Sequence, residues 1–209
     1  MKKSILWIIS LVAVWVTFSS SAIAEPPMET IRTQVNKLLE VLADPALKAE
    51  AAKETKEKKV WAIVDAVFDY SELSARTLAQ HWKAFTPEQQ KEFVRLFGKL
   101  LGNTYMDRIM AYSNEKVVFG KTSQLSDNTS EVQSEIVTAS KSIPIYYRVI
   151  LKDSQWKVFD VLIEGVSLVQ NYRTQFREIL KNKPPEDLLK MLREKVASMY
   201  AFSEGREST

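Results

Sequence analysis

Two neighbouring segments with the periodicity of β-strands constrain the fold of this chain most strongly. Apolar side chains alternate along residues 143–151, which is the pattern of a strand with one buried face. A turn-forming tetrapeptide at 152–155 leads into residues 156–163, where both faces are largely apolar. A strand that is apolar on both faces is covered on both sides, or turns one face toward a ligand cavity. These segments therefore predict an antiparallel sheet that packs against other elements or against an apolar ligand.

Weaker strand patterns at 117–119 and 131–139 extend the prediction to a three- to four-stranded meander within residues 115–163. Helical periodicity occupies residues 28–112 before the meander and 166–202 after it. This order predicts an α+β fold, in which a curved antiparallel β-sheet packs against several helices and encloses an apolar pocket.

Local signals mark where the helices begin. Asp69, Thr86 and Ser167 are predicted N-caps, because each is followed three residues later by Glu or Gln, the spacing of a capping box. The helix that follows Thr86 is predicted to be the longest and to form a wall of the core. Gly98 and Gly102 lie one turn apart on it, and either allow another element or a ligand to approach closely, or are small residues tolerated in packing.

The first residues have the three parts of a secretory signal peptide. Lys2 and Lys3 precede an apolar run over 5–18, and small residues follow, with an A-x-A pattern that ends at Ala24. An uncleaved membrane anchor is the alternative, but spanning a bilayer takes about 20 apolar residues. We therefore expect residues 1–24 to be removed by cleavage near Ala24.

The remaining chain is predicted to form one α+β domain with an apolar ligand pocket over residues 25–203, followed by a flexible tail at 204–209. It contains no cysteine, which excludes disulfides, thiolate nucleophiles and cysteine-based metal sites. The formal charge of +3 falls to about +1 without Lys2 and Lys3, so no global field favours nucleic acid. We expect a monomer that is held together by its apolar core.

The sequence offers little catalytic chemistry. His81 is the single histidine, and no nucleophile motif, P-loop or dinucleotide fingerprint accompanies it. A histidine-rich zinc site is excluded by that count. We therefore expect no enzyme activity, no catalytic residue, no metal and no cofactor.

Asp160 is the most notable acid, because strict alternation places it on one face with Trp156 and Val158. One interpretation makes it the general base of a small cone-fold enzyme, with a tyrosine such as Tyr147 as its partner. The other, which we favour, makes it a structural carboxylate satisfied by helix-terminal amides or by an arginine. The candidate arginines are Arg148, Arg173 and Arg177.

Two groups of residues resemble the MlaC family. The first is the sequence FDYSEL at 68–73, followed by Trp82, TPEQ at 86–89, Phe93 and Phe97. The second and stronger group is WKVFDV at 156–161, IEGVSLV at 163–169 and NYRTQF at 171–176. The resemblance extends from about residue 28 to residue 195. The family is also known as the toluene-tolerance auxiliary component of ABC transport systems.

The resemblance implies a periplasmic phospholipid carrier, with a bound phospholipid as cargo. Its implied partners are an inner-membrane ABC transporter with an MCE-domain subunit and an outer-membrane lipoprotein complex, and the implied role is outer-membrane lipid asymmetry. An envelope adaptor that binds a partner peptide in an apolar groove is a further alternative. Ten residues are predicted to line the lipid pocket: Val67, Phe97, Leu101, Tyr105, Tyr147, Val149, Val158, Val166, Leu168 and Tyr172.

Overall fold

A five-stranded antiparallel sheet forms one layer of the protein in the computed structural model, which describes residues 25–207. The predicted signal peptide, 1–24, lies outside the described residues. The sheet is an open meander in chain order, made of β1 (Lys116–Ser126), β2 (Thr129–Val137), β3 (Ser142–Lys152), β4 (Gln155–Ile163) and β5 (Val166–Ser167). Tight turns allow this order: Asp153 and Ser154 both have positive φ, the backbone of a two-residue hairpin that matches strand twist.

Six α-helices accompany the sheet within the described residues. They are α1 (Pro27–Ala43), α2 (Lys53–Val67), α3 (Tyr70–Leu78), α4 (Pro87–Met110), α5 (Leu168–Leu180) and α6 (Pro185–Glu207). Short 3₁₀ helices at Pro45–Leu47, Glu50–Ala52 and Ala79–Ala84 connect them. The α+β fold predicted from the sequence is confirmed.

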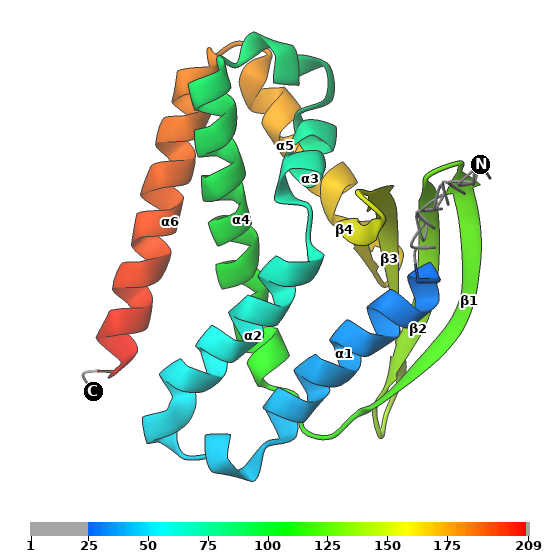
Figure 1. Ribbon diagram of the computed structural model, residues 1–209. Helices are drawn as coiled ribbons and strands as arrows, with labels where there is room; N and C mark the ends of the chain where they lie inside the picture. The colour runs from blue at the N-terminus through cyan, green and yellow to red at the C-terminus, as the bar shows by residue number, and fades with distance from the viewer. Residues whose placement is uncertain (1–24, 208–209) are drawn as a thin grey trace, which may run out of the picture.

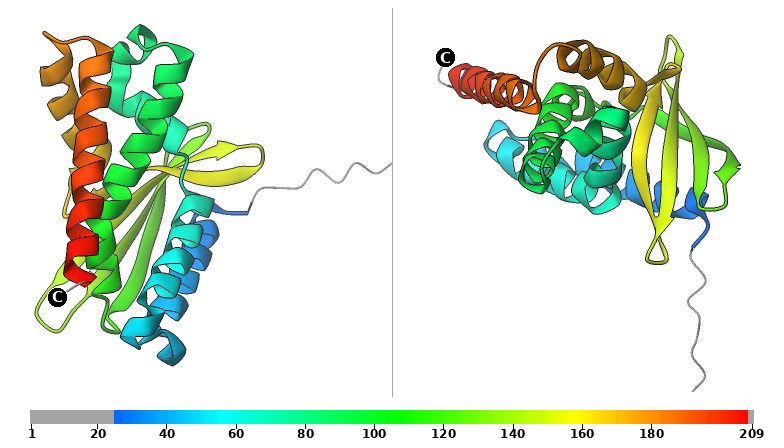
Figure 2. Two further views of the ribbon diagram at one scale, coloured as in Figure 1. Left: turned by 90° about the vertical axis from the view of Figure 1, so that its left-hand side faces the viewer. Right: turned by 90° about the horizontal axis from the view of Figure 1, so that it is seen from above.

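All the helices lie on one face of the sheet (Figures 1 and 2). In Figure 1, α1 and α2 form a hairpin beside the sheet, while α4 and α6 run side by side farther from it. α3 and α5 pack against each other and against β4 between these two groups. The core between the layers is centred on Phe93 and Phe97 of α4, whose rings contact Phe176 of α5.

The three predicted N-caps hold in the structure. Asp69 accepts a hydrogen bond from the Glu72 backbone N–H at 2.8 Å, and Ser167 Oγ accepts one from the Gln170 N–H at 3.0 Å. Thr86 forms a complete capping box with Gln89, with Pro87 in the first turn of α4. At 24 residues, α4 is the longest helix described, as its periodicity predicted.

The predicted alternation along β4 is wrong after Val158. A β-bulge at Phe159 lets Val158 pair with Val149 and Asp160 pair with Arg148, so one residue has no partner of its own. The bulge shifts Asp160 to the face opposite Val158. A one-residue slip reverses every later side chain, which is why strict alternation misplaced Asp160.

Two boundaries and the number of strands also differ from the prediction. β1 runs over 11 residues rather than three, because its exposed, polar second half lacks an apolar alternation and pairs through backbone hydrogen bonds with β2. β5 adds a fifth strand, and α6 continues to Glu207, into the segment that was predicted to be a flexible tail. None of the helices within residues 25–207 combines the length and apolar character needed to cross a bilayer.

Candidate functional site

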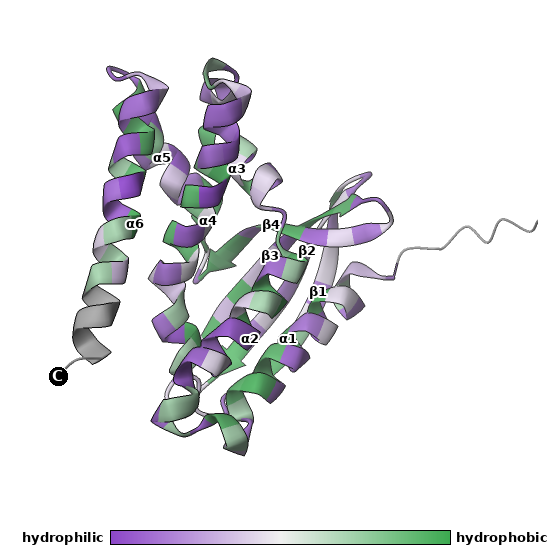
Figure 3. Ribbon diagram, turned by 60° about the vertical axis from the view of Figure 1, so that its left-hand side comes forward, coloured by the Kyte–Doolittle hydropathy of each residue, from purple (hydrophilic) through white to green (hydrophobic). Residues whose placement is uncertain are grey.

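The sheet face that meets the helices is apolar across three strands. Tyr147 on β3 pairs with Val132 on β2 and with Val161 on β4, and paired side chains lie on the same face. The adjoining rows are Ser130–Val149–Val158 and Ser134–Ile145–Ile163. We call these nine residues the inner face. Figure 3 shows apolar stretches on the strands and on the helices that flank them.

Nine of the ten predicted pocket residues gather in one cluster between the inner face and the helices. Five are buried in it and four pack against it while partly exposed: Phe97, Leu101, Val149, Val158 and Leu168, then Val67, Tyr105, Tyr147 and Tyr172. Residues of the inner face, α4 and α5 all belong to this cluster, so elements far apart in the sequence supply one apolar site. Contact of these residues with a ligand stays a prediction.

Val166 lies elsewhere. It is 58% exposed on β5, and it pairs with Ile163 across a turn formed by Glu164 and Gly165. Gly165 has φ of +82°, which reverses the chain sharply, and Val166 lies exposed on the two-residue edge strand β5. The apolar character of Val166 therefore did not indicate burial, and we leave it out of the candidate site.

Tyrosine hydroxyls supply polar groups within this apolar cluster. Burial raises the pKa of Tyr147, Tyr105 and Tyr172 above the ordinary value of a phenol. Tyr147 also hydrogen-bonds with Ser134, whose Oγ donates to the Ile145 carbonyl oxygen at 3.0 Å. The phenols are therefore neutral near pH 7 and suited to weak hydrogen bonding rather than to proton abstraction.

A hollow of about 260 Å³ opens at the edge of the cluster, where α1 begins, α2 ends and the β3–β4 turn projects. Its apolar floor is Val67 and Trp156, both packed against the core. The other lining residues are Glu25, Thr30, Gln34, Ala66, Ser154, Gln155 and Lys157. We call this the rim hollow. The rim hollow therefore has an apolar floor and a polar edge.

A second hollow, of about 430 Å³, lies on the opposite side of the sheet near the start of α5. Arg148, Leu162 and the exposed Val166 line it, with polar residues of α5. We call this the outer hollow. It is polar and open, and the register of β4 separates it from the inner face.

Asp160 is a structural carboxylate, as favoured from the sequence. Its Oδ2 accepts a hydrogen bond from Ser167 Oγ at 2.6 Å and lies 3.4 Å from Arg148 Nη1, while Oδ1 accepts one from the Val169 N–H at 3.0 Å. It is 1% exposed, and it faces away from Tyr147 because Tyr147 pairs with Val161. The proposed Asp160–Tyr147 acid–base pair is therefore not formed. The other two candidate arginines lie elsewhere: Arg173 donates to the Arg76 carbonyl oxygen, and Arg177 Nε lies 3.8 Å from Glu178 Oε1.

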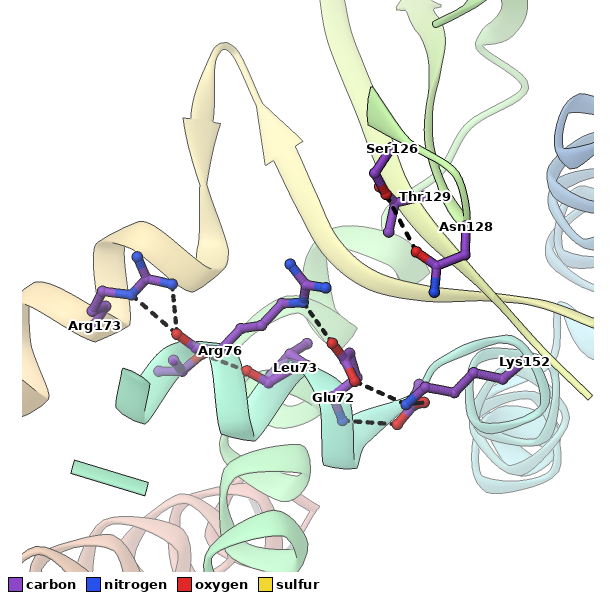
Figure 4. Close-up of polar contacts among 10 residues, drawn as sticks. Glu72, Leu73, Arg76, Ser126, Asn128, Thr129, Lys152 and Arg173 are labelled. Atoms are coloured by element: carbon purple, nitrogen blue, oxygen red, sulfur yellow. Dashed lines mark hydrogen bonds and ion pairs between the residues drawn. The ribbon is translucent and has the colours of Figure 1, made fainter. Parts of the chain in front are cut away.

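A charged cluster ties α3 to the β3–β4 hairpin and to α5 (Figure 4). Lys152 Nζ lies 2.7 Å from Asp69 Oδ2 and 2.8 Å from Glu72 Oε2, and Arg76 Nε donates to the other oxygen of Glu72. Arg173 of α5 donates twice to the Arg76 carbonyl oxygen, at 2.6 and 3.0 Å. Because these residues come from three distant segments, sequence spacing did not reveal the cluster.

Lys152 also perturbs the acids beside it. Partial burial is the largest single influence on Asp69 and Glu72 and opposes their ionisation. The hydrogen bonds and charge of Lys152, together with backbone N–H groups at Asp69 and Arg76 at Glu72, jointly outweigh it, so the pKa of each carboxyl lies below its ordinary value. Burial lowers the pKa of Lys152, but the hydrogen bonds and negative charges of Asp69 and Glu72 together raise it above its ordinary value. All three groups are charged near neutral pH. Among residues 25–207, no three histidine or carboxylate side chains are grouped as a metal site.

Comparison with known proteins identifies the family to which this chain belongs. A family model described as MlaC protein matches residues 32–194. The chain belongs to the MlaC family. A curated relative from Haemophilus influenzae, the intermembrane phospholipid transport system binding protein MlaC, is 24% identical over 135 residues. That match covers 62% of this chain and 63% of the relative, which is less than two thirds of the relative's length.

A solved structure extends the comparison beyond sequence. The phospholipid-binding protein from Ralstonia solanacearum, determined in complex with a phospholipid, is similar with a TM-score of 0.73 and 26% identity. The similarity covers 84% of this chain and 99% of that protein. The α+β fold of this MlaC-family chain is therefore shared with a protein that was solved with phospholipid bound.

Proposed function

We propose that this chain is an exported phospholipid carrier of the cell envelope, which acts in the periplasm after residues 1–24 are removed. The observation that carries the proposal is the apolar cluster between the inner face and the helices, in a fold shared with a phospholipid-bound protein. Membership of the MlaC family supports the same class of function, binding and transport of phospholipid.

The acyl chains lie, on this proposal, between the inner face and α4 and α5. Each buried methylene contributes about 0.8 kcal/mol, so two chains of about sixteen carbons gain on the order of 20 kcal/mol. Val149 and Phe97 are each 0% exposed, so chains enter this cluster only if the sheet and the helices separate. Apolar burial favours lipid retention, while separation of the two layers governs uptake and release.

The large free energy of acyl-chain burial implies that the carrier needs partner proteins. A carrier that holds lipid this strongly and has no energy source of its own needs proteins that open or compete for its site. We propose that these are an inner-membrane ABC transporter with an MCE-domain subunit and an outer-membrane lipoprotein complex. Shuttling between them would serve outer-membrane lipid asymmetry.

Transfer between vesicles tests the proposal. Donor vesicles carry a labelled phospholipid, acceptor vesicles carry none, and the full chain is added as the carrier. We expect transfer to rise with protein concentration, and to fall strongly for Val67→Arg, which places a charge at the edge of the apolar cluster. The matched control is Val118→Arg, because Val118 is 41% exposed on β1.

Three results would argue against a lipid carrier. The first is equal transfer with and without protein, and the second is equal loss for Val67→Arg and Val118→Arg. The third is capture of a peptide by the apolar site with no lipid uptake, which would instead support the adaptor.

A further inference from the structure

The two walls of the rim hollow come from different layers of the protein. One wall is the end of α2, with Ala66 and Val67, and the other is formed by residues 154–157 at the β3–β4 turn. Val67 and Trp156, one from each wall, pack against the core cluster that holds the proposed acyl-chain site. Separation of the sheet and the helices at this edge therefore exposes the apolar cluster.

Three charged side chains join the two layers immediately beside the hollow. Lys152 ends β3 and pairs with Gln155 across the turn, whereas Asp69 and Glu72 lie at the start of α3, just after the end of α2. Lys152 Nζ is 2.7 Å from Asp69 Oδ2 and 2.8 Å from Glu72 Oε2 (Figure 4). One ammonium group therefore bridges the sheet and the helical layer. We call Lys152, Asp69 and Glu72 the latch.

Both carboxylates of the latch are held in position by contacts of their own. Asp69 Oδ1 caps α3 by accepting from the Glu72 backbone N–H at 2.8 Å. Glu72 Oε1 accepts from Arg76 Nε at 2.8 Å, and the Arg76 guanidinium carbon lies 4.0 Å from the centre of the Phe159 ring on β4. In each acid the second oxygen is the one that faces Lys152. The acids are therefore oriented in advance, which reduces the entropy lost when the ion pairs form.

The latch is also partly exposed to solvent. The Lys152 side chain is 40% exposed, and the side chains of Asp69 and Glu72 are 15% and 22% exposed. Water can replace the ion pairs when they break, so breaking them costs far less than leaving an unpaired charge in a buried core. Ion pairs of this kind contribute modestly, which suits a contact that opens and closes repeatedly.

We propose that the latch closes the edge of the sheet against α3 and thereby sets the rate at which phospholipid enters and leaves. It breaks each time the layers separate, both in the protein with lipid and in the protein without it. The latch therefore raises the barriers to uptake and to release equally, and leaves the amount of lipid bound at equilibrium unchanged. This assignment rests on the proposed carrier function, which supplies the exchange of lipid.

The test is the rate of lipid exchange in both directions. The full chain is loaded with a fluorescent phosphatidylcholine, and release into unlabelled vesicles is followed over time. Uptake from labelled vesicles by lipid-free protein is followed in the same way, together with the amount bound at equilibrium. Lys152→Met keeps an aliphatic side chain and removes the charge. We expect it to speed release and uptake alike, by about two- to fivefold, the range of partly exposed ion pairs, with wild-type binding at equilibrium.

Further variants show whether the ion pairs themselves cause the effect. Asp69→Asn keeps an oxygen that caps α3 but loses the charge, so it should also speed exchange. Added to Lys152→Met it should have no further effect, because the ion pair is already gone. Lys152→Arg keeps the positive charge and should exchange lipid at close to the wild-type rate. Lys141→Met is the matched control, because the exposed Lys141–Glu164 pair joins two turns of the sheet and does not join the layers.

The variants should fold, because other contacts hold the α2–α3 junction to β4. The Asp69 backbone N–H donates to the Val158 carbonyl oxygen at 2.8 Å, and Lys157 Nζ donates to the Ala66 carbonyl oxygen at 2.8 Å. Circular dichroism checks folding, and if Lys152→Met does not fold, the rates of Asp69→Asn decide.

Three results would overturn the latch while leaving the carrier function intact. They are wild-type exchange rates in Lys152→Met, an undiminished further effect of Asp69→Asn in that background, and faster release accompanied by less lipid bound at equilibrium. The last result would make Lys152 part of the lipid-binding site. Absence of any lipid binding by the wild type would instead contradict the proposed function itself.

Discussion

Gly102 on α4 lies beneath the indole ring of Trp61 on α2, and a β-carbon at position 102 would overlap that ring. Gly98, one turn earlier, is covered by the ring of Tyr70, 3.3 Å from where its β-carbon would be. Of the alternatives open from the sequence, close approach by another element is therefore the one observed. The two glycines let aromatic side chains of α2 and α3 pack onto the backbone of α4.

Gly102→Ala should destabilise the fold although alanine favours helix. Overpacking of this kind costs ~1–3 kcal/mol, which exceeds the gain of up to ~1 kcal/mol in helix propensity. Urea denaturation measures the difference in the free energy of unfolding. Gly98→Ala is the control and should be near neutral, because its contact with Tyr70 is tight but not overlapping. Equal stability of Gly102→Ala and wild type would contradict the packing described.

Asp160→Asn should destabilise the protein by ~2–4 kcal/mol, because Arg148 would lose the charge it faces in a buried site. The amide also offers one acceptor oxygen where two carboxylate oxygens accept now. Glu131→Gln, which removes the other partner of Arg148 at 3.2 Å, should cost less because that pair is closer to solvent. A stable Asp160→Asn protein that fails to hold lipid would instead give Asp160 a direct role in the site.

The glycines of α4 and the carboxylate Asp160 show which structural features sequence patterns can predict. Periodicity and capping signals identified α4 and the strands β3 and β4, because each signal is local. The bulge at Phe159 depends on pairing with β3, so no local sequence pattern predicted it. Val166 is apolar yet exposed because the turn at Gly165 places it on the short edge strand β5, which depends on pairing with β4. The candidate site was predicted as a set of apolar residues, whereas the rim hollow required the meeting of three segments.

Lys152→Met should lower stability by up to ~1 kcal/mol near neutral pH, because it breaks two partly exposed ion pairs. The pKa values of Asp69 and Glu72 are depressed in the fold, so their stabilisation is present above the unfolded values of 3.8 and 4.5. It is lost as the pH falls through the lower folded values. The difference between variant and wild type should therefore persist from about pH 5 to 8 and shrink progressively as the pH falls below 3.8.

Denaturation at several pH values checks this prediction. Lys141→Met is the control, since both side chains of the Lys141–Glu164 pair are 57% exposed. A constant difference down to pH 2 would assign the effect of Lys152→Met to packing of its aliphatic stem.

Ala79→Gly should stabilise the protein. Ala79 follows α3 with φ of 49° and ψ of −122°, a conformation that glycine adopts far more readily than alanine. Relief of such strain is worth ~1 kcal/mol or more, and it exceeds the entropic cost of glycine. Ala75→Gly inside α3 should cost ~1 kcal/mol and serves as the comparison. A loss of stability in Ala79→Gly would contradict the backbone conformation described.

Native mass spectrometry of the full chain, purified from bacteria without detergent or delipidation, tests the central claim most directly. The account predicts a protein peak accompanied by a species heavier by the mass of one or more diacyl phospholipids, which dissociate on activation and are identified by fragmentation. Protein that carries no lipid, and that takes up none from phospholipid vesicles, would contradict it.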